Sequence, residues 1–85
     1  MKEFSYVITD PVGLHARPAS ALVQFAKQYE SQITVFANGK NCDATRLMAL
    51  MAMCIKCGTS VRVTVTGADE DRCAAALAQF LEENL

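Results

Sequence analysis

The stretch Gly13 to Ser20, GLHARPAS, holds the residues best suited to chemistry in this chain. His15 is the only histidine, Arg17 follows two positions later, and Pro18 comes directly after it. A neutral imidazole nitrogen is a good nucleophile near neutral pH, and a guanidinium can hold phosphate oxygens at two points. The pair therefore favours a site that takes a phosphoryl group onto nitrogen and steadies its charge.

The same stretch is predicted to begin a helix. Pro18 is tolerated in a first helical turn, because the N–H that it lacks would have no partner there. The free N–H groups of that turn, those of Ala16 and Arg17, lie at the positive end of the helix dipole and suit an anion. The alternative is that His15 merely caps the helix or lies on the surface.

Length, composition and charge limit the kinds of protein that could carry this site. Eighty-five residues with 52% hydrophobic and 20% charged side chains indicate one globular domain, residues 1–85. The net charge of -1 argues against a nucleic acid partner. No apolar run reaches membrane-spanning length and no signal peptide is evident, so we expect a soluble cytoplasmic protein without membrane insertion. No carboxylate pair, nucleotide loop or Ser-His-Asp set accompanies His15, which favours a carrier over an enzyme.

Periodicity predicts the elements that position the site. Alternating residues indicate strands at 3–8 and 60–66, and Asn38-Gly39 indicates a hairpin within 32–43. From Ala16 the spacing becomes helical for about three to four turns. The buried face of this helix is predicted to comprise Ala19, Leu22, Val23, Ala26 and Tyr29.

Two further helices are predicted. Residues 43–53, DATRLMALMAM, indicate a short helix that is apolar nearly all round, with Asp43 or Thr45 as its cap and Gly58 as its limit. Asp69 is predicted to cap the last helix, whose apolar stripe comprises Cys73, Ala76, Leu77, Phe80 and Leu81. The order β-α-β-β-α-β-α predicts a two-layer α+β fold with an antiparallel sheet.

With this length and element order, GLHARPA resembles the signature of the HPr family, the histidine-containing phosphocarriers of the phosphoenolpyruvate-dependent sugar phosphotransferase system. ANGK at the hairpin, RLMALM in the short helix and VTGADE before the last helix extend the likeness over the whole chain. The resemblance implies an HPr-like open-faced β-sandwich, in which a four-stranded antiparallel sheet has three helices on one face. His15 matches the phosphorylated histidine, modified on Nδ1, and Arg17 and Pro18 match the motif's arginine and proline.

The resemblance also implies partners. His15 would receive phosphate from phosphorylated enzyme I and pass it to the IIA domain of a sugar permease, with no cofactor and with the carrier as a monomer. The contact surface would comprise Ala16, Ser20, Gln24 and Lys27 from the first helix and Arg46, Leu47, Met48 and Met51 from the second. Leu47, Met48 and Met51 are interpreted as an exposed apolar patch, because a short helix cannot bury every side. Leu50 and Met53 are assigned to the core.

Two positions depart from the family pattern. Many relatives have a regulatory serine at the start of the second helix, phosphorylated by a dedicated kinase, where this chain has Arg46. Regulation at that position is expected to be absent, and Thr45 is not a safe substitute. An arginine does not mimic phosphoserine either, because its charge has the opposite sign. Val12 replaces a small polar residue, which predicts weaker stabilisation near the helix start.

Four cysteines leave other functions open. Cys54 and Cys57 form a CxxC pair that could bind metal or cycle between thiol and disulfide. Zinc needs two further ligands, and only Cys42 and Cys73 are available, so no metal is expected. Cys73 is assigned to the core. The alternatives to a sugar phosphocarrier are therefore a regulatory HPr paralogue that feeds no permease, and a CxxC redox or metal module.

Overall fold

A computed structural model describes residues 1–85 as four strands and three helices. Their order in the chain is the predicted one. The elements are β1 (Lys2–Val7), α1 (Ala16–Ala26), β2 (Gln32–Ala37), β3 (Lys40–Asp43), α2 (Leu47–Ala52), β4 (Ser60–Thr66) and α3 (Glu70–Asn84). None of these helices combines the length and apolar character needed to cross a membrane.

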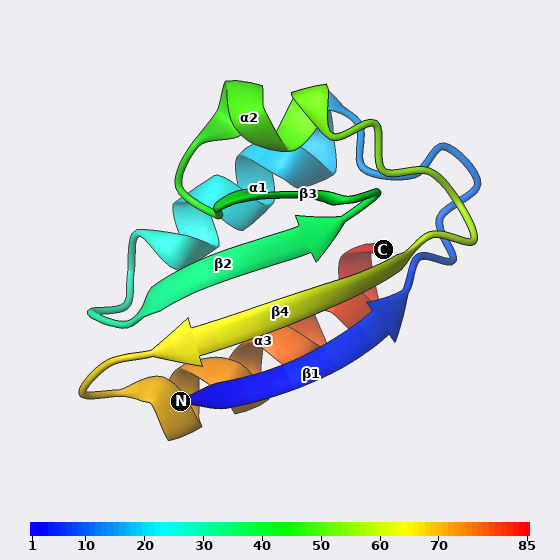
Figure 1. The fold of residues 1–85 in the computed structure, drawn as a ribbon. Helices are drawn as coiled ribbons and strands as arrows, with labels where there is room; N and C mark the ends of the chain where they lie inside the picture. Colours follow the sequence, from blue (N-terminus) through cyan, green and yellow to red (C-terminus); the bar gives the residue numbers. More distant parts are fainter.

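The strands form one antiparallel sheet in the order β1-β4-β2-β3. All three helices cover one face of this sheet and leave the other open (Figure 1). Val63 is central to the sheet, since it pairs with Phe4 of β1 on one side and with Val35 of β2 on the other. The predicted open-faced α+β architecture is confirmed.

The core lies between the sheet and the helices, because the apolar face of the sheet packs there against the apolar faces of the helices. Val61, Val63 and Val65 are buried and alternate with more exposed residues along β4. The α1 face contributes Pro18, Ala19, Leu22, Val23 and Ala26, and α3 contributes Cys73, Leu77 and Leu81. Complete burial of one such leucine stabilises the fold by roughly 1.5–3 kcal/mol relative to exposure.

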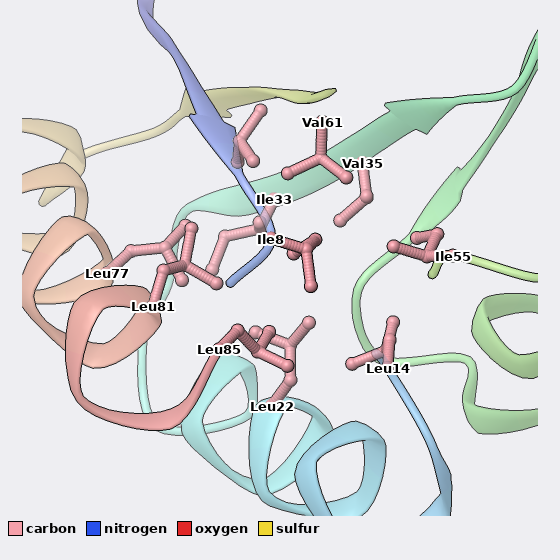
Figure 2. A pocket seen from close by; sticks show the side chains of 11 residues that line it. Ile8, Leu14, Leu22, Ile33, Val35, Ile55, Val61, Leu77, Leu81 and Leu85 are labelled. Carbon is pink, nitrogen blue, oxygen red and sulfur yellow. The ribbon is translucent and has the colours of Figure 1, made fainter. Parts of the chain in front are cut away.

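One apolar cavity of about 20 Å³ remains in this core. Eleven side chains line it, and all are hydrophobic (Figure 2). They come from β2, β4, α1, α3, two loops and the last residue of the chain. Leu14, directly before His15, and Ile55, after α2, both point toward it. Two loops that are distant in sequence are thus anchored in the same part of the core.

The helix ends differ from the sequence predictions. Helix α1 ends at Ala26, so Tyr29 lies beyond it and packs on Phe25, with ring centroids 5.0 Å apart. The predicted caps of α2 are wrong: Arg46 is the N-cap residue and makes no side-chain cap bond. The Asp43 carboxylate instead accepts hydrogen bonds from the backbone and hydroxyl of Thr45 in a local turn, the bonding that Asp favours before a helix.

Helix α2 also ends earlier than Gly58. It ends at Ala52, and Cys54 follows with a left-handed backbone of φ 53°. Asn38 in the hairpin turn stabilises this chain reversal, because its Nδ2 donates to the carbonyl oxygens of Met53 at 2.9 Å and Cys54 at 3.3 Å. The end of α2 is therefore fixed by a contact from another element.

Asp69 is the N-cap residue of α3, as predicted, but its side chain makes no cap hydrogen bond. Its carboxylate accepts hydrogen bonds from the hydroxyl and backbone N–H of Ser31 and from the backbone N–H of Glu30. The Ser31 hydroxyl is the main cause that lowers the pKa of Asp69. This carboxylate joins the loop before β2 to the turn before α3.

Candidate functional site

His15 is the N-cap residue of α1. Its backbone is extended, with φ −94° and ψ −173°, and its carbonyl accepts the Ala19 N–H at 2.9 Å. The imidazole makes no cap hydrogen bond and no ion pair, and the residue is half-buried. The side chain is therefore held at a helix start without being committed to a structural contact.

The first turn of α1 has donors without acceptors. The backbone N–H groups of Ala16 and Arg17 donate no hydrogen bond, and Pro18 has no N–H to donate. Arg17 is exposed and takes part in none of the four ion pairs. Two N–H groups, a guanidinium and an imidazole thus share one helix end whose dipole favours negative charge.

Gly13 positions this helix end through close backbone packing. The residue is buried, with φ +80°. A Cβ there would lie 2.6 Å from the carbonyl oxygen of Ile55 and 2.7 Å from the Cα of Lys56. The next residue, Leu14, donates its N–H to the same Ile55 carbonyl at 2.9 Å. The segment after α2 therefore supports the residues that lead into His15.

This support from Ile55 and Lys56 was not identified in the sequence. The contacts are made by backbone atoms, which have no signature in residue type. The only available signal was Gly13 itself, since glycine tolerates both a positive φ and a close approach of another chain segment.

Val12 precedes this contact. Its side chain is 67% exposed, and its N–H donates to the Asp10 side chain at 2.8 Å. A residue of this type supplies no polar side-chain atom near the helix start. The predicted loss of polar stabilisation at position 12 stays a prediction.

The residues predicted to contact partners lie on two helices that touch each other, α1 and α2. Those of α1 and its C-cap residue Lys27 are all exposed: Ala16, Ser20, Gln24 and Lys27. Beside them, Arg46, Met48 and Met51 are exposed, with Met48 at 78%. The interpretation of Leu47 as part of the exposed patch is only half right, because it also packs against the core. Leu50 and Met53 are buried, as predicted.

The cysteines are dispersed. Cys73 is fully buried and Cys42 half-buried, 3.4 Å from the Met53 sulfur, and burial raises the pKa of both thiols. Cys54 and Cys57 are exposed, and all four thiols are free. No three His, Cys, Asp or Glu residues are grouped to hold a metal ion. The CxxC pair thus has no further ligands within reach.

Comparison with known proteins shows the family of this chain. The family model described as PTS HPr component phosphorylation site matches residues 2–83. A phosphocarrier protein HPr from Mycoplasma capricolum is 46% identical over 81 residues, which cover 95% of this chain and 91% of the relative.

Solved structures give the same result. A histidine-containing phosphocarrier protein from Mycoplasma superposes with a TM-score of 0.92 at 43% identity, covering 96% of this chain and 93% of that one. An HPr from Thermoanaerobacter tengcongensis also gives 0.92, at 36% identity, covering 99% and 94%. The chain belongs to the HPr family of phosphocarrier proteins of the phosphotransferase system.

Proposed function

We propose that this protein accepts a phosphoryl group on His15 from phosphorylated enzyme I and passes it to the IIA domain of a sugar permease. One observation carries the proposal: the only imidazole of the chain lies uncommitted at the N-cap of α1, beside two free N–H groups and an unpaired guanidinium. Family membership supports the direction of transfer. The protein acts as a carrier that is itself transiently modified.

In the accepting step, the lone pair of the neutral His15 Nδ1 attacks phosphorus. The bond between phosphorus and the donor group of enzyme I breaks as the new P–N bond forms, and the donor keeps that electron pair. In the second step a nucleophile of the IIA domain attacks the same phosphorus, and His15 recovers its lone pair. Phosphoryl transfer of this kind depends mainly on positioning and on charge stabilisation.

Arg17 and the helix start would supply that stabilisation. The N–H groups of Ala16 and Arg17 point out of the first turn, where the helix dipole is positive, and no protein acceptor competes for them. The guanidinium of Arg17 is free to hold two phosphate oxygens at once. A charge-assisted hydrogen bond is worth about 1.5–3 kcal/mol, so each donor matters to the rate.

Partner docking would use the exposed surface around His15. The surface comprises Ala16, Ser20 and Gln24 of α1, its C-cap residue Lys27, and Arg46, Leu47, Met48 and Met51 of the α2 region. Met48 supports this assignment most strongly, because a methionine that is 78% exposed, on a helix that contacts α1, has no role in the core. A flexible apolar side chain also suits two different partners, the donor and the acceptor.

Arg46 bears on regulation. It is the N-cap residue of α2 and is exposed, but it has no hydroxyl group to receive a phosphate. Control by phosphorylation at this position is therefore not expected, and the transfer chemistry at His15 would be the main activity.

The test is phosphotransfer from enzyme I and phosphoenolpyruvate, followed by intact-mass analysis and mapping of the modified residue. We expect one acid-labile phosphate on the wild type and none on His15→Ala. An unchanged mass of the wild type would refute the proposal.

Arg17→Lys tests the proposed phosphate contact. Lysine keeps the charge but loses the two-point contact, so the transfer rate should fall by about tenfold, the effect of ~1.4 kcal/mol. Arg72→Lys is the matched control, because Arg72 is exposed at the start of α3, at the opposite end of the sheet (Figure 1). Equal rates for both variants would exclude a bidentate role for Arg17.

The acceptor is tested separately, by mixing the phosphorylated protein with a panel of IIA domains. Rapid transfer to a IIA domain of a sugar permease supports the carrier function. Transfer to none of the sugar-specific domains, with His15 still phosphorylated by enzyme I, identifies a regulatory HPr paralogue instead.

A further inference from the structure

Two loops run side by side at one end of the sheet (Figure 1). They are called the paired loops below: residues 8–14, which lead from β1 to His15, and residues 54–59, which lead from α2 to β4. Backbone hydrogen bonds join them at both ends: Gly58 N–H to the Ile8 carbonyl at 2.8 Å, and Leu14 N–H to the Ile55 carbonyl at 2.9 Å. The approach to His15 therefore depends on the 54–59 loop.

The dependence is closest at Gly13 and Leu14. Gly13 packs so tightly on Ile55 and Lys56 that even a methyl group would overlap their backbone atoms. The Ile55 side chain is buried in the core and lines the same cavity as Leu14 (Figure 2). Any turn of the Ile55–Lys56 backbone would therefore displace the two residues that precede His15.

Cys54 and Cys57 flank those two backbone positions. Both thiols are free and exposed, whereas Cys42 is half-buried and Cys73 is fully buried. The Cys57 sulfur lies 3.9 Å from the carbonyl oxygen of Thr9, in the other loop of the pair. Cys54 has a positive φ of 53°, which a side chain of this type rarely adopts and which stores strain in the loop. Because Cys54 and Cys57 are the two exposed cysteines, a soluble oxidant reaches this pair first.

We propose that Cys54 and Cys57 form a reversible thiol–disulfide site whose closure releases the backbone support of His15. A disulfide needs the two Cα atoms within about 7 Å of each other. Residues 54–56 lie in neither helix nor strand, and buried Ile55 lies between two exposed cysteines. Both thiols are free in this structure, so a disulfide would have to draw them together across Ile55 and Lys56. A turn of these two residues would break their contacts with Gly13 and Leu14.

The oxidant is a small-molecule disulfide of the glutathione type. The thiolate of Cys57 attacks one sulfur of the oxidant, so a mixed disulfide forms and one thiolate leaves, which takes up a proton. The thiolate of Cys54 then attacks the Cys57 sulfur, the protein disulfide forms, and the second small thiol leaves. The protein loses two hydrogen atoms and the oxidant gains them as two thiols. A disulfide that closes at the expense of native contacts is readily reduced, so the site is reversible.

The regulatory consequence rests on the proposed function. In the oxidised protein, Gly13 and Leu14 are no longer held against the 54–59 loop, so His15 is less well positioned and accepts a phosphoryl group more slowly. In the reduced protein the support is intact. The carrier would thus respond to the redox state of its surroundings through residues outside its contact surface.

The first experiment incubates the whole protein with glutathione disulfide, alkylates the remaining thiols and maps the peptides. We expect a Cys54–Cys57 disulfide that dithiothreitol reverses. Cys54→Ser and Cys57→Ser should yield at most a mixed disulfide, whereas the control Cys42→Ser should still form the bond. Absence of a Cys54–Cys57 disulfide in the wild type would overturn the proposal.

The second experiment measures hydrogen exchange of the Leu14 amide in the reduced and oxidised protein. Loss of its bond to Ile55 should speed exchange by about tenfold, and neither cysteine variant should show the change. A disulfide with unchanged Leu14 exchange would contradict the coupling to His15.

The third measurement is the rate of phosphoryl acceptance from enzyme I, which should fall on oxidation and recover on reduction. If the reduced wild type accepts no phosphate at all, the proposed function fails. Peptide mapping and Leu14 exchange would still decide on the thiol–disulfide site, because neither readout involves phosphate.

Discussion

Replacement of Gly13 by alanine tests how the structure supports His15. At φ +80°, alanine is strained by about 1–2 kcal/mol relative to its preferred backbone conformations. Its methyl group would also lie 2.6 Å from the Ile55 carbonyl oxygen and 2.7 Å from the Lys56 Cα. Both are backbone atoms, so no side-chain rotation relieves the overlap and the paired loops must separate. Overpacking of this kind costs about 1–3 kcal/mol, which brings the expected loss to about 2–5 kcal/mol.

Gly39→Ala is the matched control. Gly39 has nearly the same φ, +75°, but nothing lies within 4 Å of a Cβ built there. The two variants share the strain of the positive φ and the entropy lost from the unfolded chain. The difference between them, about 1–3 kcal/mol, therefore isolates the close approach to the 54–59 loop.

Urea unfolding of the reduced proteins measures both variants, and phosphoryl acceptance from enzyme I reports on His15. We expect Gly13→Ala to be the less stable and to accept phosphate more slowly, while Gly39→Ala keeps the wild-type rate. Equal destabilisation of the two variants, with equal transfer rates, would refute the role assigned to the Gly13 contact.

Further variants test other parts of the structure. Met48→Ala should leave the free energy of unfolding within about 0.5 kcal/mol of wild type but weaken binding to enzyme I in a titration. Leu50 is fully buried, so Leu50→Ala should lower the free energy of unfolding in urea by about 2–5 kcal/mol. Asn38→Ala should lower stability by about 1–2 kcal/mol and speed amide exchange after α2, because two carbonyls lose their donor. The pKa of Asp69 is lowered in the folded state, so its stabilisation is present above about pH 4 and is lost as pH falls through its folded pKa. The free energies of unfolding of wild type and Ser31→Ala should therefore become more alike as the pH falls. A difference between them that does not change with pH would contradict this role of the Ser31 hydroxyl.

The sequence alone determined the elements and the chemical character of the site. Burial of one face of a strand or helix imposes a fixed spacing on its apolar residues. The alternation along residues 60–66 and the helical spacing after Ala16 could therefore be recognised from neighbouring residues alone. The placement of His15 at a helix start follows from Pro18 and the change of period beside it. The order of these elements predicted an antiparallel sheet in a two-layer fold, and the resemblance to a known family then supplied the placement of all three helices on one face and the expected partners, which local patterns do not contain.

Only the tertiary structure decided what holds these parts in place. The Asp69 carboxylate was expected to cap its own helix, but Ser31 and Glu30 from another loop offer donors that it accepts instead. Side-chain oxygens bond to whichever donors the fold brings near, and the sequence does not give those distances. Likewise Leu47 is half-buried because the core lies on its side of a helix that is apolar nearly all round.

The support of His15 illustrates the same limit. The motif residues in GLHARPAS were recognisable because their side chains carry the chemistry. The carbonyl of Ile55 and the Cα of Lys56, which fix Gly13 and Leu14, belong to a backbone that every residue shares. Residue types therefore determined which group would react, whereas only the packing of two loops distant in sequence determined where that group is held.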